Sequence, residues 1–139
     1  MTNKDDNVVR ALIKGTENHK IQWMSVSAVN FKQLREAGEI VEDAYGYWDN
    51  KSRRIIIYKV SSFVINPYDG EEVEKVNIYL GFTKGNSYKP DFTISDSDLD
   101  NSSLMWTLYK LVKRNESGAD LIINDIIKEF GDPDDDLPF

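Results

Sequence analysis

Apolar residues recur at two different spacings along the chain, and the change of spacing predicts helices at both ends with strands between them. Residues 5–14 carry an apolar helical face behind two aspartates, and Gly15 follows as the predicted helix stop. A second, short helix is predicted behind Ser27, with Gly38 as its stop. The N-terminal third of the chain is therefore expected to be largely helical.

The spacing then changes to the alternation and the β-branched, aromatic composition of strands. The predicted strands are residues 40–48, 53–65 and 73–82. The polar residues DNKS at 49–52 predict a turn, so the first two strands should form a hairpin. The stretch IQWMSV at 21–26 is either a fourth strand or a buried connector.

Helical spacing returns after residues 83–101, a polar, turn-rich stretch predicted to be a long surface loop. One helix follows Asn101 or Ser102, and Gly118 separates it from a second helix over residues 121–130. That second helix is so apolar that we expect it to pack on the body. The predicted fold is α+β, a three- to four-stranded antiparallel meander packed against N-terminal and C-terminal helices.

Length and composition agree with one small domain and exclude several kinds of chemistry. The chain has 139 residues, which suits a single domain over residues 1–130. It has no cysteine and one histidine, so we expect neither catalytic thiols nor a zinc site, and we predict a protein that is not an enzyme and has no cofactor. Neither a signal sequence nor a membrane-spanning apolar run is visible, so we expect a cytoplasmic protein without membrane contacts.

Negative charge is concentrated in the last nine residues, GDPDDDLPF. The formal net charge is −7, and the four aspartates of residues 131–139 account for −4, which leaves −3 for residues 1–130. Gly131 and Pro133 should stop the preceding helix, and the acidic run cannot bury enough apolar surface to fold. Residues 131–139 are therefore predicted to be a flexible acidic tail.

This tail has the chemistry of a docking peptide. Its carboxylates would attract a basic surface, and Leu137 and Phe139 would anchor it in a shallow apolar pocket. Pro138 restricts the backbone between these anchors, and a terminal carboxylate on Phe139 would add a group for an arginine to bind. A merely solubilising tail would explain the aspartates but not the apolar end.

The sequence DDDLPF resembles the acidic tip of bacterial single-stranded DNA-binding proteins. The resemblance implies recruitment of replication, recombination and repair enzymes through a basic pocket with an apolar bottom. The residues that would bind such a partner are Asp134, Asp135, Asp136, Leu137, Pro138 and Phe139. The body departs from that family, whose members begin with a five-stranded OB-fold and a long linker. Instead it resembles small uncharacterised proteins of Gram-positive bacteria and their mobile elements, a resemblance that implies no activity.

The predicted hairpin also brings aromatic and basic residues together, as surfaces that stack single-stranded DNA do. The candidate contacts are Trp48, Lys51, Arg53, Arg54 and Lys59. Acidic neighbours such as Glu42 and Asp49 oppose phosphate binding, so DNA is a possible partner that we do not expect to bind strongly.

Two further alternatives concern the body. An acidic domain of this size could be an antitoxin, an immunity-like protein or an inhibitor that acts through its folded surface, with the tail incidental. The spacing of Asp96, Asp98 and Asp100 suggests calcium, but the glycine and distal glutamate of an EF-hand loop are missing, so we predict no metal site.

Overall fold

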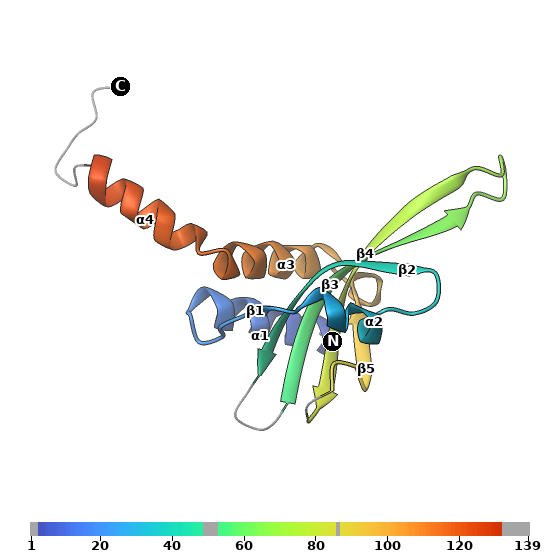
Figure 1. Ribbon diagram of the computed structural model, residues 1–139, viewed down its shortest axis with the longest axis horizontal. Coiled ribbons are helices and arrows are strands. Elements are labelled where there is room, and N and C mark those ends of the chain that lie inside the picture. Colours follow the sequence, from blue (N-terminus) through green and yellow to red (C-terminus); the bar gives the residue numbers. More distant parts are fainter. Residues whose placement is uncertain (1–2, 49–52, 86, 132–139) are drawn as a thin grey trace.

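The computed structural model describes residues 3–48, 53–85 and 87–131, and these residues form five strands and four α-helices (Figure 1). The helices are α1 (Lys4–Glu17), α2 (Phe31–Leu34), α3 (Ser103–Glu116) and α4 (Ala119–Phe130), with short 3-10 helices η1 (Ala28–Asn30) and η2 (Asp96–Asp98). The strands are β1 (Met24–Ser25), β2 (Glu39–Trp48), β3 (Arg53–Ile65), β4 (Glu72–Lys84) and β5 (Phe92–Ser95).

The strands form one antiparallel meander in the order β1-β2-β3-β4-β5. The α+β class and the meander are confirmed, whereas the sheet has one strand more than the largest predicted number. The additional strand, β5, lies in the stretch 83–101 that was expected to be a loop, and it pairs with β4 from Tyr79↔Ser95 to Phe82↔Phe92. Residues 21–26 supply β1, which is only two residues long.

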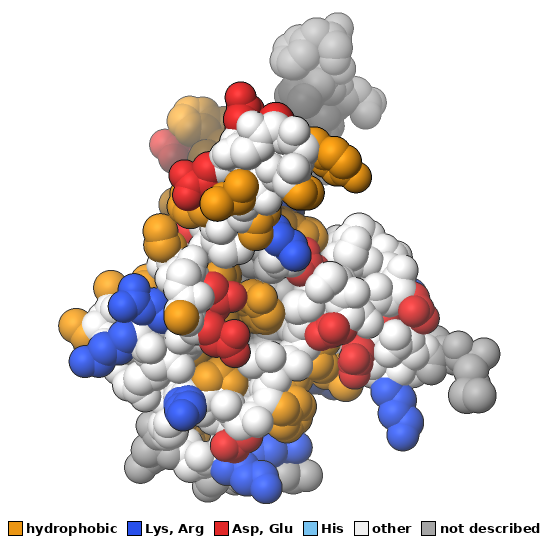
Figure 2. All heavy atoms as spheres, turned by 90° about the vertical axis from the view of Figure 1, so that its right-hand side faces the viewer, with side chains coloured by type: hydrophobic (Ala, Val, Ile, Leu, Met, Phe, Trp, Pro, Cys, Tyr) orange, Lys and Arg blue, Asp and Glu red, His pale blue; other side chains and the backbone are white. Residues whose placement is uncertain are grey.

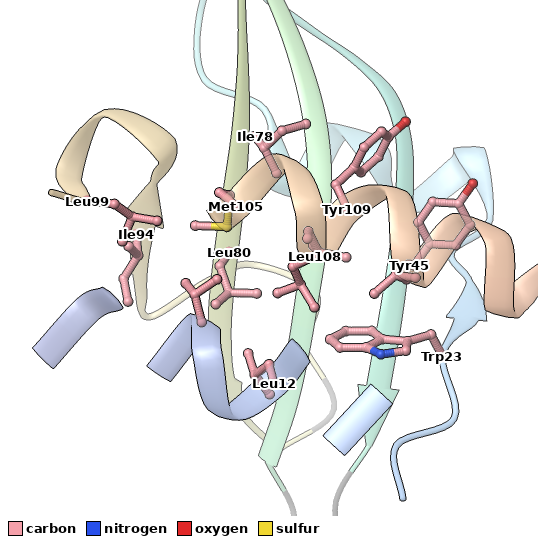
Figure 3. Close-up of a cluster of buried hydrophobic side chains, with 13 residues drawn as sticks. Leu12, Trp23, Tyr45, Ile78, Leu80, Ile94, Leu99, Met105, Leu108 and Tyr109 are labelled. Atoms are coloured by element: carbon pink, nitrogen blue, oxygen red, sulfur yellow. The ribbon is translucent and has the colours of Figure 1, made fainter. Parts of the chain in front are cut away.

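Helices α1 and α3 lie side by side on one face of the sheet and enclose the larger core (Figure 3). Leu12 comes from α1, Leu108 from α3 and Leu80 from β4, and their side chains meet between the helices and the strands. The buried side chains of this core also include Trp23, Tyr45, Ile57, Ile78 and Met105. Alternating residues of β4 face this core, since Ile78 and Leu80 are buried in it and Phe82 packs against it.

A smaller cluster covers the opposite face of the sheet. There Val26, which directly follows β1, and Leu34 of α2 pack against Ile56, Tyr58 and Val60 of the central strand β3. Alternating residues of β3 therefore belong to two different cores, which explains why its sequence is apolar almost throughout rather than at every second position. Strand β3 is the centre of the sheet, and its residues line the surfaces described below.

Helix α1 continues two residues beyond Gly15, so the prediction that this glycine ends the helix is wrong. The glycine is needed for close packing: a Cβ atom at this position would lie 2.7 Å from the Cδ1 of Ile21. Thr16 follows it inside the core, where its hydroxyl donates to the carbonyl of Leu12 at 2.7 Å and accepts from Nε1 of Trp23 at 2.9 Å. The contact fixes the connection from α1 to β1.

Helix α4 does not pack on the body, contrary to expectation. It follows α3 after Gly118, whose φ of 73° turns the chain, and it then runs away from the sheet (Figure 1). Helical spacing and composition predicted the helix correctly, but they do not say which surface covers it. The far ends of β3 and β4 also extend beyond the layers as a hairpin arm, with Phe63, Val64 and Ile65 exposed.

Candidate interaction sites

The C-terminal segment presents a continuous apolar surface along α4. Every large apolar side chain of this helix is at least 40% exposed, and that of Phe130 is 78% exposed. These side chains are Leu121, Ile122, Ile123, Ile126, Ile127 and Phe130. The residues predicted to bind a partner, Asp134, Asp135, Asp136, Leu137, Pro138 and Phe139, lie outside the described residues, as do the other positions from 132 onward. Gly131, the last described residue, lies at the end of α4 that is remote from the sheet (Figure 1).

Two of the predicted nucleic-acid contacts meet at the end of the β2–β3 hairpin. Trp48 and Arg54 are opposite each other in the strand register, and the guanidinium carbon of Arg54 lies 4.5 Å from the centre of the Trp48 ring. Tyr88 covers the guanidinium as well, at 4.0 Å from its ring centre. Arg54 also donates to the carbonyl of Ser87 at 3.3 Å. The cation is thus engaged by two aromatic rings, each contact being worth about 0.5–1 kcal/mol when exposed.

The remaining predicted contacts are dispersed. Arg53 is one position earlier in β3, so its side chain leaves the opposite face of the sheet. Lys59 forms an ion pair with Glu42 at 3.1 Å, and the pKa of Glu42 is lowered by the Ser61 hydroxyl and by this lysine. Lys51 lies outside the described residues. The hairpin therefore brings Trp48 and Arg54 into contact, whereas Arg53 and Lys59 do not join them.

Sequence reasoning missed Tyr88, the second ring against Arg54. Trp48, Arg54 and Tyr88 border a hollow of about 440 Å³ that continues over Gln22 and Met24. Tyr88 belongs to the connection between β4 and β5, which folds back on the sheet so that Pro90 covers Gly81. The only local signal was an aromatic residue in a polar stretch, because the contact joins residues 34 positions apart.

A larger groove of about 560 Å³ opens on the helical face of the same sheet end. One wall is α1, with Val8, Ala11 and Leu12, and the floor consists of Ile55, Phe82 and Phe92. Phe82 and Phe92 stack at 4.7 Å between ring centres, which keeps this floor flat and apolar. Phe92 is 59% exposed, so the groove offers a large aromatic surface to solvent.

Basic residues border this groove. Arg53 and Lys84 are partners in the β3–β4 register, two positions beyond the Ile55↔Phe82 pair, so both belong to the strand face that forms the groove floor. The acidic lining residue Asp91 accepts a hydrogen bond from the backbone N–H of Lys84 at 3.0 Å. On the face drawn in Figure 2, Lys and Arg side chains gather mainly in the lower half, where this end of the sheet lies.

A third hollow, of about 280 Å³, lies beside the stacked rings of Tyr58 and Tyr79. The hydroxyl of Tyr79 donates to Glu39 at 3.4 Å. Burial raises the pKa of both tyrosines, and the negative charge of Glu39 raises it further. These hydroxyls therefore remain protonated at neutral pH and act as hydrogen-bond donors rather than as bases.

Asp96 and Asp98, two of the aspartates with the spacing that suggests calcium, accept hydrogen bonds from other groups of the protein. Asp96 accepts hydrogen bonds from Asn77 at 2.8 Å and from the Trp106 ring at 3.1 Å, and Asp98 accepts from the backbone N–H of Ser95 at 2.9 Å. Over residues 3–48, 53–85 and 87–131, no group of three or more metal-binding side chains is placed to hold an ion.

Comparison with known proteins does not assign the chain to a family. No protein-family model, curated protein or solved structure matches it. In the part of the chain that the structure describes, none of the helices has the length and apolarity required to cross a membrane.

Proposed function

We propose that this protein is a non-enzymatic bacterial or phage accessory protein whose C-terminal residues dock onto enzymes of DNA replication, recombination or repair. The observation that carries the proposal is the sequence DDDLPF at 134–139, which combines three adjacent carboxylates with a Leu-Pro-Phe anchor. A partner needs a basic surface around an apolar pocket to bind such a segment. Docking would either recruit the enzyme or withhold it from its usual ligand.

The position of α4, the helix that precedes this segment in the sequence, supports the proposal. Helix α4 is 12 residues long and leads away from the sheet, so it extends the chain by about 18 Å beyond the end of α3. A partner that holds residues 134–139 would lie next to the exposed apolar side chains of α4. Ile126, Ile127 and Phe130 are the nearest of them, and they would extend the contact beyond the tip.

Competition binding tests the proposal directly. An enzyme that binds the tip of a single-stranded DNA-binding protein is loaded with a fluorescent tip peptide, and the full chain is added as competitor. We expect the wild-type chain to displace the peptide and Phe139→Ala to need at least about tenfold more protein, a loss of about 1.4 kcal/mol or more. Added salt should weaken displacement, because part of the attraction is exposed charge.

Phe63→Ala is the matched control, since it removes an exposed phenylalanine from the hairpin arm. Equal displacement by the wild-type and Phe139→Ala chains would overturn the proposal. A partner captured equally well by both chains would instead favour the folded body as the binding module, in the manner of an antitoxin or inhibitor.

A further inference from the structure

The groove between α1 and the ends of β3, β4 and β5 has the features that an acidic peptide with apolar anchors requires. Its volume of about 560 Å³ lies in the range of sites that enclose a small ligand or several side chains. The stacked Phe82 and Phe92 form an apolar floor, while Arg53 and Lys84 stand together at one end. An apolar floor with a basic margin selects for negatively charged ligands that also carry apolar groups.

One segment of this chain has this complementary chemistry. Residues 134–136 carry three carboxylates, and Leu137 and Phe139 follow as apolar anchors. We propose that the groove binds residues 134–139 of a second copy of the chain, with Leu137 and Phe139 on the aromatic floor and the aspartates toward Arg53 and Lys84. The inference uses the same residues as the proposed function, but it does not depend on any outside partner.

The fold favours binding between copies rather than within one. Helix α4 runs away from the sheet, and the groove is at the sheet end where β3 begins, in the lower part of Figure 1, whereas the described chain ends at the top. Eight residues after Gly131 can span at most about 29 Å when fully extended. They are joined to Gly131, which follows the outer end of α4, and this end of the helix is remote from the sheet.

The resulting contact would join two different surfaces, a tail on one copy and a groove on the next. Such head-to-tail contacts add subunits without a fixed limit unless a ring closes. Copies joined in this way would also hide the segment that is proposed to bind enzymes. Rising protein concentration would then reduce the number of free tails.

Two variants separate the two halves of the contact. Ala11→Glu places a bulky, negative side chain in the groove at an exposed helical position, where glutamate is compatible with the helix. A Leu137→Ala/Phe139→Ala double variant removes the anchors and leaves the groove intact. We expect the wild-type chain to associate as its concentration rises in sedimentation velocity, and each variant alone to remain monomeric.

Mixing the two variants gives the decisive result. The Ala11→Glu chain keeps an intact tail and the double variant keeps an intact groove, so their equimolar mixture should form a dimer and nothing larger. Charge reversal at Lys84→Glu should weaken wild-type association at least about tenfold. Lys75 is also exposed but lies toward the opposite end of β4, so Lys75→Glu should leave association unchanged.

Three outcomes would overturn the inference. First, the wild-type chain could stay monomeric up to about 1 mM. Second, the Leu137→Ala/Phe139→Ala variant could still self-associate. Third, the equimolar mixture of the two variants could remain monomeric. The second outcome would indicate pairing through α4 instead. Failure of the proposed function is distinguishable, because Ala11→Glu must still displace the tip peptide from the enzyme if that function is correct.

Discussion

The carboxylate of Asp6 accepts a hydrogen bond from the backbone N–H of Asp100 at 2.9 Å, across 94 positions of sequence. Its second oxygen accepts from Asn101 at 3.1 Å. Asp6 is 4% exposed, so these bonds are shielded from water. They tie the first turn of α1 to the chain entering α3 and thereby hold together the two helices that cover the larger core.

Removing this carboxylate should therefore destabilise the fold. We expect Asp6→Ala to lower the free energy of unfolding by about 2–3 kcal/mol, since it leaves two backbone donors without their charged acceptor. Equilibrium unfolding in urea measures the change. Asp5→Ala is the matched control. The Asp5 carboxylate only complements the dipole of α1, so this variant should lose less than about 1 kcal/mol of the free energy of unfolding. Equal losses in the two variants would contradict this role.

The second prediction concerns pH. The hydroxyl of Tyr109 donates to Asp43 at 2.6 Å, and burial, followed by this hydrogen bond, raises the pKa of Tyr109 above its usual value near 10. A raised folded-state pKa adds stability below the unfolded pKa, and this contribution is lost as the pH rises above that value. Tyr109→Phe should cost about 1.5–3 kcal/mol at pH 7, as expected for a hydrogen bond to a charged group.

The difference between the wild-type and Tyr109→Phe proteins should then shrink above pH 10, because only the wild-type unfolded chain can ionise at this position. Urea unfolding at pH 7 and at several values above 10 provides the comparison. A constant difference across this range would show that Tyr109 titrates at the same pH in the folded and unfolded states.

The third prediction addresses α4. Because Ile126 is 51% exposed, Ile126→Ala should change the free energy of unfolding by no more than about 0.5 kcal/mol in dilute protein. Leu108→Ala in α3 removes a fully buried side chain and should cost about 2–5 kcal/mol. A cost above about 2 kcal/mol for Ile126→Ala would mean that α4 packs against the body.

The fourth prediction is that single-stranded DNA binds weakly. Arg54 is already engaged by Trp48 and Tyr88, and residues 1–130 carry a net negative charge. Titration with a fluorescent oligothymidine should give a dissociation constant above about 1 µM at physiological salt. Any residual binding should fall with Trp48→Ala and persist with Lys59→Ala, since Lys59 is held by Glu42 away from the stack. Nanomolar affinity would make DNA the principal ligand.

The local pattern of apolar and polar residues was sufficient to predict most of the fold but little of the candidate sites. The three long strands and α3 were predictable because their apolar spacing persists over many residues. Strand β5 was not, since four residues in a polar stretch carry too short an alternation, and only pairing with β4 makes them a strand. Tyr88 and the groove were missed for a related reason, because both are assembled from distant segments.

The prediction that α4 packs on the body was wrong for a different physical reason. Six large apolar side chains in one helix indicate that something should cover them, but composition does not distinguish a surface of the same chain from that of another molecule. The tail chemistry at 134–139 is entirely a sequence inference, because those positions lie outside the described residues.

The consecutive order of the strands has a consequence for folding kinetics. Every strand pairs with its neighbour in the chain, so the sheet can grow from successive hairpins at low loop-closure cost. Docking of α1 on α3 is different, since the equivalent positions of these helices are 99 residues apart. We expect this step to come after the rate-limiting barrier, so that Leu108→Ala accelerates unfolding more than it slows refolding in stopped-flow measurements. Helices α1 and α3 would then close over a sheet that has already formed.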